Sequence, residues 1–256
     1  MNRIDLNADL GESFGRYTLG MDDRLLPVIS SASVACGFHA SDPVVMEKTV
    51  LLARRANVAV GAHPGYPDLM GFGRRPMAVT PAEARAYVLY QLGALDAFLR
   101  PHGMKLRHVK PHSALYNAAA ADPALARAVC EAVRDFDPSL VLYGLSGSCL
   151  VRAAEDAGLA ACSEVFADRA YEEDGTLVPR GKPGAVISDE QEAIRRVLRM
   201  VTEGRVAAVT GKDIPLRADT VCVHGDGEKA VLFAAAVRRA LEGNGIRVCA
   251  PGAPSA

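Results

Sequence analysis

Histidines and carboxylates recur directly after short apolar segments of this chain. Four of its six histidines occupy such positions, namely His39, His63, His112 and His224. Carboxylates accompany them at Asp9, Glu12, Asp68 and Asp226. A lone histidine is most often a hydrogen-bonded structural side chain, and His102 and His108 lack this placement. The repetition at equivalent positions instead indicates a shared site for acid–base or metal chemistry.

Two chemistries are open for this cluster. As acid–base catalysts, its members would be Asp9, Glu12, His39, His63 and His112. As a metal centre, Asp9, His39 and His63 could hold a divalent ion, because imidazole and carboxylate suit zinc, manganese or iron. The chain has no H-E-x-x-H motif to favour the metal.

Cations also stand near the ends of apolar segments. Lys110 and Arg169 could stabilise negative charge that develops during a reaction. Asp168 and Arg169 could equally form a local ion pair that fixes the segment following them.

The elements that must position these groups are short apolar runs that alternate with helical patterns. The runs predict seven strands and a weaker eighth: Ile4–Leu6, Ser33–Ala35, Val58–Val60, Leu106–Val109, Leu140–Tyr143, Ala160–Phe166, Thr220–Val223 and Arg247–Cys249. Strand–helix alternation predicts a parallel sheet, whose carboxyl ends gather catalytic groups. No Gly- or Ser-rich linker interrupts the 256 residues, so we expect a single α/β domain over residues 1–256.

Helix starts are marked by capping residues placed before proline or a capping-box partner. Asp42-Pro43, Thr80-Pro81 and Asp122-Pro123 predict three starts, and Ser188 with Gln191 predicts a fourth. The segment Asp174–Val186 contains three glycines and two prolines, so it predicts a long loop or hairpin on the active face.

Composition narrows the function classes. Lys and Arg number 29 and Asp and Glu 30, which argues against a nucleic-acid partner. No apolar run is long enough to span a membrane, and the polar N-terminus does not look like a secretory signal. Six scattered cysteines without a C-x-x-C motif predict reduced thiols in a cytoplasmic protein. A P-loop motif is absent.

Several strings of the chain resemble the LamB/YcsF family in content and order. They are Asp5–Glu12 (DLNADLGE), Ala35–His39 (ACGFH), Gly61–Leu69 (GAHPGYPDL), Gly71–Arg75 (GFGRR), Lys110–Asn117 (KPHSALYN), Glu164–Tyr171 (EVFADRAY), Gly175–Arg180 (GTLVPR) and Asp219–Asp226 (DTVCVHGD). The chain departs from the family pattern at Ser41 and Ser113, where glycine is usual. At these two positions we expect the local backbone to differ from that of family members with glycine.

The resemblance implies a fold and an activity. The fold would be a single (β/α) barrel of about seven parallel strands, similar to the glycoside hydrolase/deacetylase superfamily. The activity would be the opening of 5-oxoproline to L-glutamate, with ATP as cosubstrate converted to ADP and phosphate. The chain would be one of three different subunits of this 5-oxoprolinase, the one designated A, and would act together with the B and C subunits.

Roles for individual residues follow from this resemblance. Asp9 or Glu12 would orient or activate water, with His39 and His63 moving protons and His112 lining the site. The substrate- or phosphate-binding groups would be Asn7, Lys110, Glu164, Asp168, Arg169, Arg180, His224 and Asp226. Two other functions stay open, a stand-alone metal-dependent amidohydrolase or deacetylase and a non-catalytic substrate-binding subunit.

Overall fold

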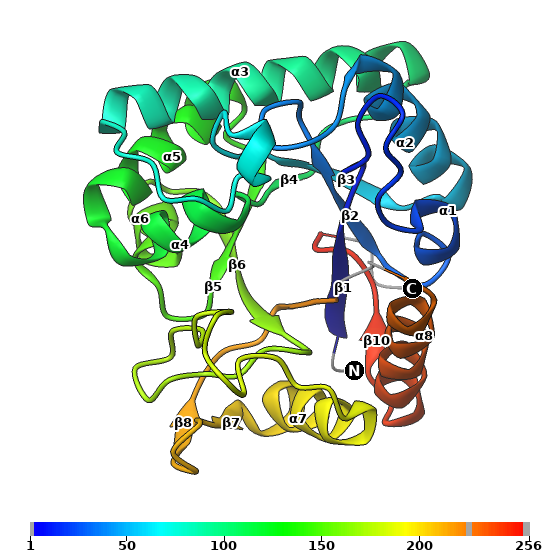
Figure 1. Ribbon diagram of the computed structural model, residues 1–256, viewed down its shortest axis with the longest axis vertical. Coiled ribbons are helices and arrows are strands. Elements are labelled where there is room, and N and C mark those ends of the chain that lie inside the picture. Colours follow the sequence, from blue (N-terminus) through cyan, green and yellow to red (C-terminus); the bar gives the residue numbers. More distant parts are fainter. Residues whose placement is uncertain (1–2, 224–226, 253–256) are drawn as a thin grey trace.

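The computed structural model describes residues 3–223 and 227–252, and its centre is a closed ring of parallel strands. In ring order the strands are β1 (Arg3–Leu10), β2 (Ser31–Ala35), β3 (Ala59–His63), β4 (His108–Val109), β5 (Val141–Leu145), β6 (Ala160–Phe166) and β9 (Thr220–Cys222). Strand β9 pairs with β1 as well as β6, which closes the barrel, and β10 (Arg247–Val248) pairs with the outer part of β1. The prediction of one barrel with about seven parallel strands is confirmed (Figure 1).

Helices surround the strands (Figure 1). They are α1 (Asp22–Leu25), α2 (Pro43–Ala56), α3 (Pro81–Leu99), α4 (Ser113–Ala121), α5 (Pro123–Phe136), α6 (Cys149–Asp156), α7 (Glu190–Glu203) and α8 (Glu228–Gly243), with 3₁₀ turns η1 (Leu69–Gly71) and η2 (Arg100–His102). No helix in the described part of the chain is both long enough and apolar enough to cross a membrane.

Three of the four predicted helix starts are confirmed. Asp42, Thr80 and Asp122 each accept a backbone N–H of the first turn, and Thr80 forms a full capping box with Glu83. The prediction at Ser188 was wrong by one residue, because the carboxylate of Asp189 accepts the first-turn N–H of α7.

Strand β1 shows how the barrel separates its apolar and polar faces. Ile4, Leu6, Ala8 and Leu10 are buried in the hydrophobic core that joins the sheet to the helices. Successive side chains of a strand point to opposite faces, so the residues between them point into the barrel. Those residues are Asp5, Asn7 and Asp9, and each contacts a side chain from a different part of the ring.

Asp5 lies at the amino-terminal end of the barrel interior and satisfies its carboxylate with hydroxyl groups. It accepts hydrogen bonds from Ser30, Ser31, Tyr143 and Thr220 at 2.6–2.9 Å. Burial raises the pKa of Asp5, although these four hydroxyls oppose the shift. The polar interior therefore begins well below the active face and continues upward through Asn7 to Asp9.

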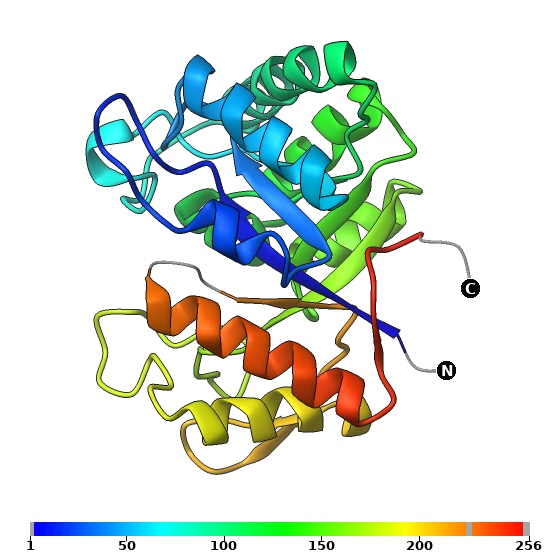
Figure 2. The same ribbon diagram turned by 90° about the vertical axis from the view of Figure 1, so that its right-hand side faces the viewer.

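Three segments after strands lie at the same side of the barrel (Figure 2). They are the loop after β1, the turn η1 after β3 and the long loop after β6, which contains the predicted segment 174–186. Two isolated bridges, Arg169 with Val186 and Tyr171 with Leu177, fold this long loop back on itself. A short antiparallel pair, β7 (Arg205–Ala207) and β8 (Asp213–Pro215), was not predicted.

Both serines that replace the usual family glycine adopt a left-handed backbone. Ser41 has φ 74° and Ser113 has φ 35°, a region that disfavours side chains with a Cβ. Ser41 precedes the cap of α2 and Ser113 begins α4 directly after His112. The two departures from the family pattern therefore fall where the turn geometry favours glycine.

Candidate functional site

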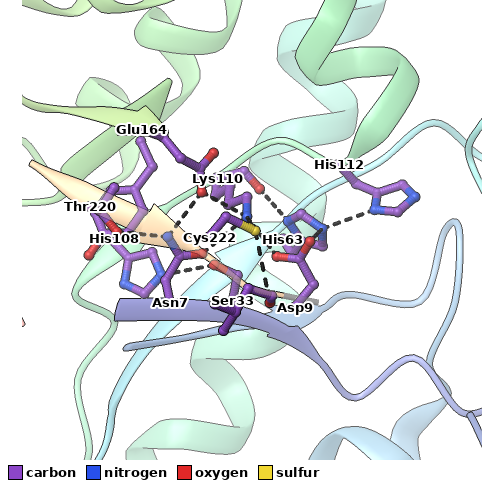
Figure 3. A network of polar contacts seen from close by, with 12 residues as sticks. Asn7, Asp9, Ser33, His63, His108, Lys110, His112, Glu164, Thr220 and Cys222 are labelled. Carbon is purple, nitrogen blue, oxygen red and sulfur yellow. Dashed lines mark hydrogen bonds and ion pairs between the residues drawn. The ribbon is translucent and has the colours of Figure 1, made fainter. Parts of the chain in front are cut away.

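The polar side chains meet at the carboxyl ends of the strands, as expected for a parallel barrel. Asp9 lies near the end of β1, His63 ends β3, Lys110 follows β4, and His112 directly precedes α4. Figure 3 shows Lys110 surrounded by Asn7, Asp9 and Glu164, with His63 and His112 on the side of Asp9. The predicted convergence of residues from distant segments is thus observed.

Lys110 is the centre of a buried charge network. Its ammonium lies 3.0 Å from Asp9 Oδ1, 2.9 Å from Glu164 Oε1 and 3.1 Å from Asn7 Oδ1. Burial opposes the charge, but the acidic groups around it, Asp9 first, hold the pKa of Lys110 well above its usual value. Three oxygen acceptors match the three N–H donors of an ammonium group, so Lys110 organises the carboxylates rather than reaching into solution.

Asn7 and Glu164 support Lys110 from below. Both are fully buried, and Asn7 donates to Glu164 Oε1 at 3.0 Å and to Thr220 at 2.7 Å. Their predicted role was to bind substrate or phosphate. Their contacts are with protein side chains, so their observed place is beneath the reacting surface.

Two imidazoles face each other beside Asp9. His63 Nδ1 donates to the backbone carbonyl of Lys110 at 2.7 Å, and His112 Nε2 donates to that of Phe72 at 2.8 Å. A carbonyl can only accept, so each neutral ring carries its hydrogen on that nitrogen and a lone pair on the other. The remaining nitrogens, His63 Nε2 and His112 Nδ1, lie 2.9 Å apart.

Two lone pairs at this distance repel each other, so a positive charge bound by both nitrogens is needed to offset the repulsion. A proton shared by the two rings can supply it, as can a divalent cation bound by both nitrogens. Carboxylates are available to balance that charge, because Asp9 lies 3.4 Å from His63 and Glu12 lies 3.6 Å from His112. The carbonyl bonds on the far nitrogens are also those that orient histidines in metal sites.

His39 forms a layer behind this pair. It is fully buried, its ring stacks on His112 with centroids 3.7 Å apart, and its Nε2 lies 3.3 Å from Glu12. Burial, and then the neighbouring imidazoles, hold the pKa values of His39 and His112 well below the usual histidine value. The surroundings therefore disfavour a positive charge on the ring of either residue.

The metal-ligand group differs from the predicted set of Asp9, His39 and His63. Glu12, His39, His63 and His112 offer ligand atoms within 4.8 Å of one another, whereas Asp9 is paired with Lys110. The lone pairs of parallel, stacked rings do not converge, and the rings of His39 and His112 differ by only 2°. His63 and His112 are nearly perpendicular, at 88°, so these two imidazoles are the pair that fits one ion.

A cavity of about 800 Å³ opens above the site. Its lining includes Asp9, Glu12, His63 and His112, together with the start of α6 and part of the long loop. The loop contributes residues 174–177, 179 and 180 to the lining, so part of it lies on the same cavity as the histidine–carboxylate cluster.

Arg169 anchors the long loop. Its guanidinium donates to the carbonyls of Val178 at 2.6 Å and Ala185 at 3.3 Å, and the side chain is buried. Arg169 was expected to fix the segment that follows it. It does contact this segment, and its guanidinium donates to backbone carbonyls there. Arg169 and Arg180 both line the cavity, while the carbonyl of Asp168 accepts from Ile187.

Some predicted residues are not brought into the cluster. Asp68 caps η1 and pairs with Arg75, which gives it a structural place. His224 and Asp226 fall outside the described residues. Conversely, Arg74 lines the cavity although no role was expected for it, and its signal was the string GFGRR.

These features define a parallel α/β barrel protein with a histidine–carboxylate site at the carboxyl ends of its strands. The chain belongs to the LamB/YcsF family, whose family model matches residues 4–255.

Curated relatives are similar over nearly the whole chain. A protein of Thermococcus onnurineus, named as the A subunit of 5-oxoprolinase, is 60% identical over 246 residues, 96% of each chain. The protein of the same name from Clostridium beijerinckii is 56% identical and covers 97% of both. The crystal structure of a lactam utilization protein from Thermus thermophilus superimposes with a TM-score of 0.92 at 51% identity, covering 97% of this chain and 99% of that one.

Proposed function

We propose that this chain is the A subunit of an ATP-dependent 5-oxoprolinase, which opens 5-oxoproline to L-glutamate together with the B and C subunits. The observation that carries the proposal is the paired imidazoles flanked by Asp9 and Glu12, in a chain 60% identical to a protein named as the A subunit of 5-oxoprolinase. Its six free cysteines suit the reducing cytoplasm, where we place the enzyme.

The chemistry explains why ATP would be consumed. A five-membered lactam is an unstrained, resonance-stabilised amide, so water attacks its carbonyl carbon slowly. Transfer of a phosphoryl group from ATP to the lactam oxygen would make that carbon electrophilic and provide a leaving group. The protein must then deliver water: one molecule adds to that carbon, the ring C–N bond breaks as its nitrogen takes up a proton, and a second molecule releases phosphate from the acyl phosphate that remains.

The site residues are suited to that second task. Asp9 and Glu12 both line the cavity and lie beside the facing imidazole nitrogens, so either carboxylate can orient an attacking water. That carboxylate would take the proton of the water, and the proton shared by His63 and His112 would go to the ring nitrogen as the lactam opens. Lys110 holds Asp9 in place throughout.

His63, His112 and Glu12 would hold a divalent cation through one ligand atom each. When bound, it would polarise an oxygen of the substrate and lower the pKa of a water molecule. Metal analysis of the purified chain, with melting temperatures before and after chelation, tests this part. If the chain contains no metal and added zinc leaves its melting temperature unchanged, the charge shared by His63 and His112 is a proton.

The decisive assay is release of glutamate from 5-oxoproline by the chain with its candidate partner subunits, with and without ATP. His63→Ala should abolish turnover, whereas His102→Ala should not, because His102 lies in η2 away from the cluster. Unchanged turnover by His63→Ala would remove His63 from the mechanism.

The alternatives give different results in the same assay. Release of acetate from acetylated substrates by the chain alone, without ATP, would identify a stand-alone deacetylase. Full turnover by Asp9→Asn and Glu12→Gln complexes would identify a binding subunit whose partner performs the chemistry.

A further inference from the structure

Among the described residues, five lysine and arginine side chains line the cavity, and four of them have contacts with other protein groups. They are Arg74, Lys110, Arg152, Arg169 and Arg180. The ammonium of Lys110 is surrounded by acceptors, and Arg169 is bound to loop carbonyls. Arg152 donates to the carbonyl of Gly147 at 2.5 Å, and Arg180 also has contacts.

Arg74 is different. Its guanidinium makes no hydrogen bond or ion pair with any residue in the ranges 3–223 and 227–252, and it lies 5.0 Å above the ring of Phe72. A cation over an aromatic face is attracted to the ring, yet all five N–H donors stay available. Arg74 is thus a preplaced cation with its hydrogen-bonding capacity unused by the described residues.

The segment that carries Arg74 is fixed to the reacting groups. The carbonyl of Phe72 accepts from His112 at 2.8 Å, and the Phe72 ring meets the His112 ring edge-on at 5.5 Å. Gly73, in a left-handed turn, accepts from the backbone of Ala114 at 3.2 Å. The position of Arg74 is therefore set relative to the imidazole pair.

The charge pattern of this end of the cavity selects an orientation for an anionic substrate. Asp9 and Glu12 form an acidic floor that repels a carboxylate, whereas an uncharged lactam carbonyl can approach it. A carboxylate on the same small ring then needs a cation at the edge of the floor. A guanidinium is well suited, because its parallel N–H groups bind a carboxylate in a bidentate manner.

We propose that Arg74 binds the carboxylate of 5-oxoproline and thereby directs the lactam carbonyl toward Asp9, Glu12 and the His63–His112 pair. The assignment rests on the proposed function and makes Arg74 the residue that selects lactams bearing a carboxylate. Lys110, one of the residues expected to bind substrate or phosphate, is in contact with Asp9 and Glu164.

The test compares Arg74→Gln and Arg74→Lys in the complex reconstituted with the B and C subunits. Arg74→Gln should raise KM for 5-oxoproline about 10- to 100-fold with kcat within about threefold, the scale of one charged hydrogen-bonding interaction. Arg74→Lys should recover part of the loss. Arg55→Gln, which removes an exposed arginine from the last turn of α2, is the matched control and should match the parent enzyme.

A second probe shows whether the effect belongs to the carboxylate. 2-Pyrrolidinone is the same ring without that group, and its inhibition constant against 5-oxoproline should be the same for Arg74→Gln and the parent. A KM within twofold of the parent, or an equal loss of affinity for both molecules, would overturn the assignment. Absence of ATP-dependent glutamate release by the parent complex would instead refute the proposed function, and the assignment with it.

Discussion

Removing the Lys110 ammonium is the sharpest test of the charge network. Lys110→Met keeps a similar side-chain length and deletes the charge that lies within 3.1 Å of Asp9, Glu164 and Asn7. Glu164 is fully buried and Asp9 largely so, with an 18% exposed side chain. Neither carboxylate can regain full hydration while the barrel stays folded.

The expected loss is large. Breaking a buried ion pair by removing one partner costs about 3–5 kcal/mol, because a charge is left buried without compensation. For a chain of this size that corresponds to a fall in melting temperature of about 6–20 °C. Since the folded pKa of Lys110 is raised, its contribution is fully present below the unfolded value of 10.5 and is lost only at higher pH. The deficit should therefore be the same from pH 7 to 9.

The loss of stability can be measured by urea unfolding of four proteins. They are the parent, Lys110→Met, Glu164→Gln and the double variant. Replacing the stranded carboxylate by an amide should recover part of the loss, giving a coupling energy of about 1–3 kcal/mol. Lys48→Met, at an exposed position on α2, should stay within about 0.5 kcal/mol of the parent. A Lys110→Met variant within 1 kcal/mol of the parent would refute the network as described.

Three further expectations concern other parts of the molecule. Ser41→Gly and Ser113→Gly should each stabilise the fold by about 0.5–1 kcal/mol, because both serines have a positive φ. Ser188→Gly is the control, because Ser188 does not have a positive φ, and it should not stabilise the fold. A gain in stability for Ser188→Gly would contradict this explanation. Burial lowers the pKa of His108 to about 3, so its contribution is present above pH 6.5 and is lost as pH falls toward 3. His108→Gln should make the acid limb of a stability–pH profile shallower by up to about 1.4 kcal/mol per pH unit, and an unchanged slope would contradict this. Arg169→Met should speed tryptic cleavage of the long loop after Arg180 without lowering barrel stability by more than about 2 kcal/mol. Equal cleavage rates would show that the loop is held by other contacts.

The barrel was predictable because its signals are local. Runs of buried apolar residues predict the strands, and Asp42, Thr80 and Asp122 announce helices through residue type alone. The hairpin β7–β8 gave no such signal, because each strand has three residues and neither forms an apolar run. Ser188 and Asp189 are both good caps, and only the position of the first turn of α7 decides between them.

The sequence indicates which residues gather at the site, but not which of them face the cavity and which are buried beneath it. Position after a strand indicates which residues gather, yet it does not say which ones face the cavity. Lys110 and Asn7, 103 positions apart, meet below the surface through contacts that depend on the whole ring. Arg74 was missed for the opposite reason, since an exposed arginine in a loop gains meaning only from the cavity beside it.

The ring is closed by the pairing of β1 with β9, two strands from opposite ends of the chain. Thr220 joins Asp5 and Asn7 across this seam, over a sequence separation of up to 215 residues. During synthesis on the ribosome, the inward-facing polar groups of β1 therefore lack their hydrogen-bond partners on β9 until nearly all of the chain has emerged. Truncation before β9 should leave a nascent chain that cannot bury Asp5 and Asn7, and such a chain would depend on chaperones.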